Sequence, residues 1–86
     1  MPTIAYFLGI AIQMYYDDHP PPHIHVKYNE HQARFAIETG ELISGSLPAR
    51  ARRLVQEWIE LRRTELADNW RRMENGEQME RIEGLE

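Results

Sequence analysis

The first half of the chain alternates apolar and polar residues in short runs, and a period of two residues is typical of a β-strand with one buried face. In the first run, Ile4, Tyr6 and Leu8 share one face, and Gly9 separates this run from the next. The runs are residues 4–8, 10–16, 23–28 and 33–37, with a short fifth at 41–44. The pattern therefore predicts four or five short strands that follow one another along the chain.

The alternation also sets the register expected between the third and fourth strands. A two-residue loop at positions 30–31 pairs Val26 with Phe35 and places Arg34 opposite Lys27. A slip of one residue would turn apolar side chains to the polar face of the sheet. Neither loop residue favours a tight hairpin turn, so a four-residue loop in the same register is the alternative.

A helical period replaces the alternation over residues 48–74. Ser46 or Leu47 is expected to cap the start of this helix, and Asn75-Gly76 is a typical stop signal. The pattern predicts one long C-terminal helix, and a break near Thr64 would give two shorter ones instead.

The apolar positions of this helix fall within about half of its circumference. They are Ala51, Leu54, Val55, Trp58, Ile59, Leu61, Leu66, Trp70 and Met73. Arg62 and Asn69 fall inside the same stripe, where polar side chains are unusual. We expect them to reach polar groups at the sheet edge or to extend their ends to solvent.

These elements predict an α+β fold in which an antiparallel β-meander of four to five strands is packed by one long C-terminal helix. Residues 1–76 would form a single α+β domain. Residues 77–86 contain four Glu and no clear periodicity, and they are expected to form a loosely ordered acidic tail.

Composition narrows the class of protein. The 86 residues are 42% apolar and 28% charged, and they include no cysteine. This balance is typical of one small globular domain and excludes disulfides and thiolate metal ligands. Residues 1–4 lack the basic region of a secretion signal, and no apolar run approaches the roughly 20 residues of a membrane span. The sequence therefore predicts a cytoplasmic protein without membrane contact.

Charge is unevenly distributed along the chain. The net charge is −4, whereas residues 48–74 carry seven Arg and five acidic residues, a net of +2. Arg50, Arg52 and Arg53 lie in the first turns of the predicted helix, where positive charge is disfavoured by the helix dipole. They are candidates for contact with an acidic partner or a phosphate. Direct nucleic-acid binding is disfavoured by the acidic net charge, and no helix-turn-helix spacing supports it.

A histidine–proline cluster at residues 17–25 carries the most specific chemistry. His23 and His25 are two residues apart on a predicted strand, so their side chains leave the same face. His19 is brought near them by the turn of three prolines, and Asp17 and Asp18 add carboxylates.

Such a cluster has three interpretations. His19, His23 and His25 could hold a divalent transition metal, and two His with one carboxylate is a known metal-site pattern. The same groups could perform acid–base chemistry without a metal. The structural alternative is a rigid turn whose imidazoles bond backbone groups and exposed carboxylates.

The chain also resembles the bacterial family called domain of unknown function 4160. The resemblance rests on Met-Pro-Thr-Ile at residues 1–4 and on the family motif Asp-His-x-Pro-Pro-His-x-His at residues 18–25. It continues through residues 37–41, 47–48, 54–58, 65–66 and 69–70. Members are often labelled transcriptional regulators or placed beside antitoxin-like proteins, so the resemblance implies a small regulatory complex.

The chain departs from the family pattern in two places. Arg62 occupies a position that is often His in relatives, and the tail is more acidic here. If the helix histidine of the family joins the cluster, Arg62 weakens a shared metal site in this chain.

Two functions are weighed above direct DNA binding, and whether the protein is an enzyme is left open. The first is a regulatory or interaction module of a toxin–antitoxin-like or transcription-regulator pair, which binds a protein partner. The alternative is a hydrolase or ribonuclease, metal-dependent or not, with His23 and His25 as catalytic residues. In that case Asp18 or His19 orients them, and Lys27 or Arg34 contacts an anionic substrate.

Overall fold

The computed structural model describes residues 3–16 and 18–85. Met1, Pro2, Asp17 and Glu86 lie outside the described residues. They include half of the N-terminal Met-Pro-Thr-Ile motif and one carboxylate of the histidine–proline cluster.

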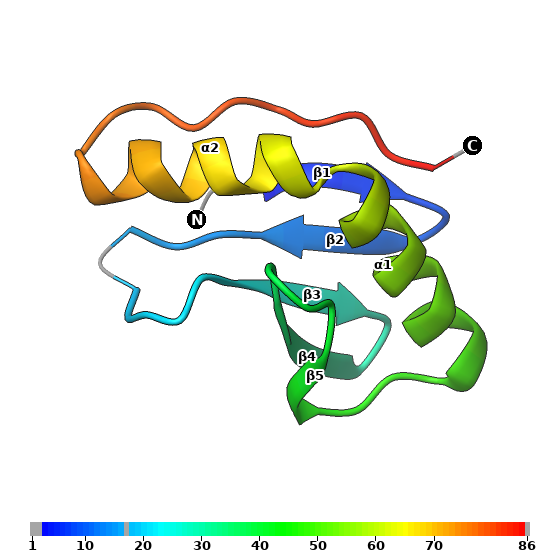
Figure 1. Cartoon of the computed structure of the whole chain (residues 1–86). Helices are drawn as coiled ribbons and strands as arrows, with labels where there is room; N and C mark the ends of the chain where they lie inside the picture. Colours follow the sequence, from blue (N-terminus) through cyan, green and yellow to red (C-terminus); the bar gives the residue numbers. More distant parts are fainter. Residues whose placement is uncertain (1–2, 17, 86) are drawn as a thin grey trace.

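Five antiparallel strands form one sheet, in which each strand pairs with the strand before it (Figure 1). The strands are β1 (Thr3–Phe7), β2 (Ile10–Gln13), β3 (His23–Tyr28), β4 (His31–Ala36) and β5 (Leu42–Gly45). Two helices follow the sheet in the chain. The predicted α+β class and the β-meander are confirmed.

The first strand differs from the predicted alternation. Ile4 is buried, whereas Tyr6 and Leu8 are 63% and 54% exposed, so the prediction that these three share a face is wrong. The register with β2 shifts between Thr3 and Ala5, and such an irregularity breaks the two-residue period. Leu8 and its neighbour Gly9 both take positive φ, 51° and 81°, which closes a tight two-residue turn outside the sheet.

The β3–β4 hairpin differs from the predicted register by two residues. His25 pairs with Arg34, and Val26 pairs with Ala33, so the pairing of Val26 with Phe35 is wrong. The turn lies one residue earlier than expected because Asn29 takes a φ of 53°, a conformation that Asn tolerates better than most residues. A shift of two residues keeps each side chain on its predicted face.

The predicted single helix is two helices, α1 (Ala49–Leu61) and α2 (Arg63–Glu74), which meet at an angle at Arg62 (Figure 1). A straight helix over the same residues would be about 39 Å long, whereas the longest dimension of the molecule is 34 Å. The bend keeps both helices on the sheet and leaves Leu61, which the stripe predicted to be buried, 61% exposed. No helix in the described part of the chain is long and apolar enough to cross a membrane.

The two helix ends differ in how well the sequence predicted them. Pro48 is the N-cap of α1, and no side chain caps this end, so the predicted Ser46 or Leu47 cap is wrong. At the end of α2, Gly76 takes a φ of 72°, and its N–H donates to Met73 O while that of Glu77 donates to Arg72 O. This pair of bonds is the Schellman arrangement expected where glycine follows a helix.

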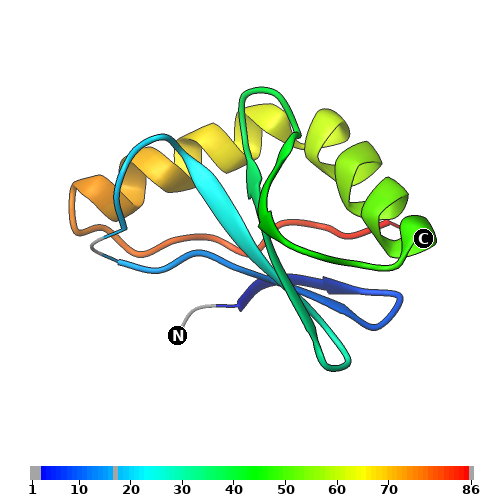
Figure 2. The same ribbon diagram turned by 90° about the horizontal axis from the view of Figure 1, so that it is seen from below.

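The helices cover one face of the sheet and enclose the core (Figures 1 and 2). The largest fully buried side chains are Trp58, Phe35, Ile4, Ile10, Ile12, Met14, Ile24, Ile37, Ile59, Leu66, Val26 and Val55. Burial of such apolar surface is the main favourable term in folding. The opposite face of the sheet is not covered by a helix, and it carries most of the polar strand residues.

Residues 77–85 run as an extended arm between α2 and β1 (Figure 2). The side-chain amide of Asn69 exchanges two hydrogen bonds, 2.8 and 2.9 Å long, with the backbone of Glu80. The N–H of Ile82 donates to Ile4 O, and Trp58 Nε1 donates to Glu83 O. Asn69 thus belongs to the buried helix face because it pairs with the tail.

Candidate functional site

Three side chains of the histidine–proline cluster converge at the start of β3. Asp18 lies in the loop between β2 and β3, His23 is the first residue of β3, and His25 is two residues further on. Asp18 Oδ2 lies 2.9 Å from His25 Nε2 and 3.2 Å from His23 Nε2. The three potential ligand atoms all lie within 4.8 Å of one another. We call these three residues the Asp-His-His group.

The proline turn fixes the orientation of His23. Its Nδ1 lies 2.8 Å from the carbonyl oxygen of Pro21, and the carbonyl of Pro22 accepts from Ile37 N–H at the end of β4. The Pro20–Pro21 peptide bond is cis. The loop is therefore bonded both to the imidazole and to the neighbouring strand.

The bond to Pro21 determines which nitrogen of His23 carries a hydrogen. A carbonyl oxygen only accepts, so Nδ1 must be the donor, and Nε2 of the neutral ring is then an acceptor. This Nε2 is buried, has no hydrogen-bond partner among the described residues, and faces the Asp18 carboxylate. Two acceptors that face each other in a buried site repel unless a cation or an extra proton lies between them.

Aromatic rings enclose the two histidines. The His23 ring lies 5.5 Å from that of Trp70 on α2 and 5.1 Å from that of His25. The ring centroids of His25 and Tyr15 are 4.4 Å apart, and the two rings are nearly perpendicular. The side chains are 7% exposed for His23, 17% for Asp18 and 24% for His25. Electrostatic interactions are stronger in such a poorly hydrated place than at the open surface.

The structure replaces one member of the predicted ligand set. His19 is exposed and lines a hollow together with Asp18 and His23, but it is outside the Asp-His-His group. The turn points His19 to solvent, whereas Asp18, one residue earlier, turns inward. The described residues thus combine Asp18 with His23 and His25, rather than His19 with these two.

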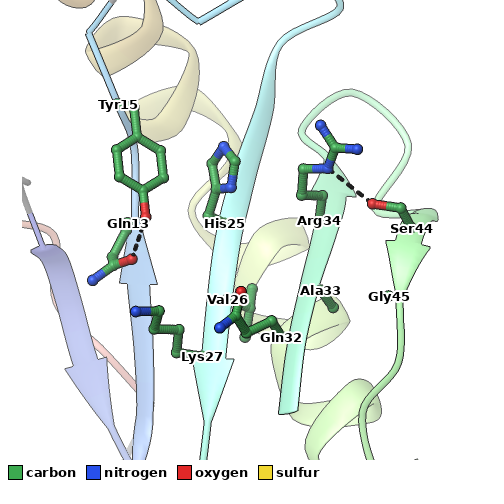
Figure 3. A pocket seen from close by; sticks show the side chains of 10 residues that line it. All are labelled: Gln13, Tyr15, His25, Val26, Lys27, Gln32, Ala33, Arg34, Ser44 and Gly45. Atoms are coloured by element: carbon green, nitrogen blue, oxygen red, sulfur yellow. Dashed lines mark hydrogen bonds between the residues drawn. The ribbon is translucent and has the colours of Figure 1, made fainter. Parts of the chain in front are cut away.

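Lys27 and Arg34, predicted to contact an anion, lie beside His25 on the uncovered sheet face (Figure 3). They line a hollow of about 310 Å³ that we call the sheet groove. Its lining residues are Gln13, Tyr15, His25, Val26, Lys27, Gln32, Ala33, Arg34, Ser44 and Gly45. Arg34 Nε donates to Ser44 Oγ at 2.8 Å, which orients the guanidinium. Arg34 also lines the hollow next to Asp18 and His23, so it connects the two places.

Arg50, Arg52 and Arg53 do not join this site. All three are exposed on α1, and Arg50 lines a separate hollow with Tyr28, the last residue of β3. His23 is the first residue of that strand, so the two ends are about 17 Å apart. Contact of these arginines with a partner therefore stays a prediction that does not involve the histidines.

Three residues of the site were not identified from the sequence. Tyr15 packs on His25 and donates to Gln13 Oε1, and Trp70 packs on His23. The alternation of residues 10–16 could have placed Gln13 and Tyr15 on the polar face. Trp70 carried no such signal, because its contact with His23 depends on where α2 crosses the end of the sheet.

The fold and the site define a small α+β protein with two histidines and one carboxylate at the end of an antiparallel sheet. The family model described as domain of unknown function (DUF4160) matches residues 9–71, and the chain belongs to this family. No curated protein and no solved structure matches the chain. The toxin–antitoxin-like or regulatory role and its protein partner stay predictions.

Proposed function

We propose that the protein binds a divalent transition metal ion through Asp18, His23 and His25 and hydrolyses an anionic ester with it. The observation that carries this proposal is the buried Nε2 of His23, an acceptor that faces a carboxylate. A divalent cation satisfies that nitrogen, His25 Nε2 and Asp18 Oδ2 at once. The bond from His23 Nδ1 to Pro21 is the support that metal-binding histidines usually have from a backbone carbonyl.

The distances in the Asp-His-His group support the same proposal. Zinc bonds to nitrogen and oxygen ligands are about 2.0–2.2 Å long, so neighbouring ligands of a tetrahedral site are about 3.3 Å apart. Asp18 Oδ2 is 2.9 Å from His25 Nε2 and 3.2 Å from His23 Nε2. Small movements of side chains therefore suffice to form the site. Two histidines with one carboxylate suit zinc, iron(II), cobalt(II) or nickel(II).

Three protein ligands leave coordination positions for water and substrate, which is typical of catalytic rather than structural sites. A bound metal ion lowers the pKa of its water to about 7 and polarises an ester oxygen. Arg34 lies opposite His25 in the β3–β4 pair, and its guanidinium is oriented by Ser44. We expect Arg34 to bind the negative charge of the ester and to stabilise the charge that develops during hydrolysis.

Isothermal titration of the protein with Zn²⁺ and Co²⁺ tests the binding step. We expect one ion per chain, and His23→Asn should weaken binding by about 100-fold or more because one of three ligands is lost. Asparagine keeps a donor near the position of Nδ1 for the Pro21 carbonyl and removes the part of the ring that contains Nε2. His31→Asn is the matched control, since His31 is outside the Asp-His-His group, and it should bind metal as the wild type does.

Hydrolysis of a chromogenic phosphodiester by the metal-loaded protein tests the second step. Asp18→Asn should remove this activity, and His31→Asn should retain it. Equal metal affinity of the wild type and His23→Asn would contradict the metal site. Tight metal binding without hydrolysis would restrict the proposal to a binding role.

A further inference from the structure

Strand pairing places the polar side chains of the uncovered face in two rows across the sheet. One row runs through Tyr6, Ala11, Lys27 and Gln32, which are consecutive partners from β1 to β4. The other runs through Gln13, His25, Arg34 and Ser44 from β2 to β5. Residues paired across strands share a face, so Tyr6 lies on the same face as Lys27, two strands away and beside the lining of the sheet groove.

The two cations of the groove are free to bind an anion. Within residues 3–16 and 18–85, neither Lys27 nor Arg34 forms an ion pair, and no acidic residue lines the groove. They stand on adjacent strands in neighbouring rows, a diagonal arrangement with roughly 7–8 Å between positions. A single phosphate group can bridge side chains at this spacing. The positive groove contrasts with the chain as a whole, whose net charge is −4.

The open face beside the groove also carries groups suited to a nucleobase. Tyr6 is 63% exposed on the open face, and an exposed aromatic side chain on a sheet is the usual platform on which unpaired bases stack. Gln32, exposed on β4, offers an amide donor and an amide acceptor along the same surface. An acidic peptide would be attracted by the cations alone and would leave the aromatic side chain unexplained.

We infer that the sheet groove binds a nucleoside phosphate, with the phosphate between Lys27 and Arg34 and the base against Tyr6. This inference names the substrate class of the proposed hydrolase and so rests on the proposed function. A hollow of about 310 Å³ lies at the lower end of the range for small-ligand sites and suits one nucleotide unit. The nucleotide comes either free or as part of a single RNA strand. The His25 side of the groove then brings its phosphate next to the Asp-His-His group.

Binding is measured with metal-free protein, so that the groove is tested apart from the metal site. The probes are inorganic phosphate, adenosine monophosphate and a short single-stranded oligouridine. Lys27→Gln and Arg34→Gln should each weaken binding of all three by about tenfold or more, as expected for loss of a charged hydrogen bond. Arg81→Gln is the matched control, because this exposed arginine of the tail lines a hollow with residues of α2 and does not line the groove, and it should have no effect.

Two further measurements test the contact with the base and distinguish a free nucleotide from an RNA strand. Tyr6→Ala should weaken binding of the nucleotide and of the oligouridine by about fivefold or more, because stacking is lost. Binding of inorganic phosphate should stay unchanged. If the ligand is a strand, the affinity of the oligouridine should exceed that of the mononucleotide. For the oligouridine, the slope of log K against log salt concentration should also become smaller by roughly 0.7 for each cation removed.

The outcomes distinguish this inference from the proposed function. His23→Asn should lose metal binding and keep nucleotide binding. Arg34→Gln should keep metal binding and lose nucleotide binding. Equal losses in Arg81→Gln and Arg34→Gln would overturn the inference, as would binding of oligoglutamate as tightly as of the nucleotide. Absence of nucleotide binding with an intact metal site would overturn the inference alone.

Discussion

His23 and Asn69 are both buried polar side chains, and they differ in how their polar atoms are used. Asn69 is 1% exposed, and its oxygen and its nitrogen each bond to the backbone of Glu80. His23 is 5% exposed, and only Nδ1 has a hydrogen-bond partner, whereas Nε2 faces the Asp18 carboxylate.

The difference separates a structural role from a functional one. A buried polar group is costly unless it is hydrogen-bonded, so Asn69 can be retained for stability alone: it joins α2 to the tail. His23 has one nitrogen fixed by the proline turn and the other without a donor or acceptor that matches it. Under the proposed function, a bound metal ion is the partner of this atom.

The largest effect that distinguishes the two regions is the response to metal. A ligand that binds only the folded state raises the free energy of unfolding by about 2.7 kcal/mol at 100 times its Kd. Zn²⁺ at that excess should therefore raise the unfolding midpoint of the wild type and of Asn69→Ala alike. Thermal unfolding followed by circular dichroism measures this, and a similar shift in His23→Asn would contradict the assignment of His23 as a ligand.

Replacement of Asn69 should have the next largest effect. Asn69→Ala removes two hydrogen bonds to the tail, each worth about 1–1.5 kcal/mol. It gains about a few tenths of a kcal/mol in helix propensity. We expect a loss of about 2 kcal/mol in urea unfolding and faster hydrogen exchange at Ile82, whose N–H bonds to Ile4 O.

The neighbouring Asp68 provides the control for that measurement. It pairs with Arg71 at the surface, and Asp68→Ala should change the free energy of unfolding by no more than about 0.5 kcal/mol. If both variants lost the same amount, the bonds between Asn69 and the tail would not be the cause.

Of the changes at the two compared residues, His23→Asn without metal should have the smallest effect. The variant keeps a donor for Pro21 and loses ring contact with Trp70, so we expect a change of about 1 kcal/mol or less in the free energy of unfolding. A loss above about 3 kcal/mol, the cost of breaking a buried ion pair, would instead show that a protonated His23 is paired with Asp18 in the folded protein.

The candidate site shows which of its features the sequence predicted and which it did not. The spacing of His23 and His25 was enough to place both on one strand face, and the charges of Lys27 and Arg34 were enough to name them as anion contacts. The sequence placed Arg34 opposite Lys27, two residues from its observed partner His25. The register was missed because it depends on which residue accepts positive φ in the turn. The choice between Asp18 and His19 depended on the path of the proline loop, which no periodicity describes.

The sequence by itself determined four strands with an expected fifth, the helical segment with its stop at Asn75-Gly76, and the faces on which the residues of β3 and β4 lie. These properties follow from local periods of two and 3.6 residues and from the backbone preferences of single residues. Only the tertiary structure decided the bend at Arg62, the pairing of Asn69 with the tail, and the meeting of Asp18 with His23 and His25. Each of these brings together segments whose contact is set by the length of the sheet, the path of a loop and the packing of a helix across it, and none of these is encoded in a local pattern.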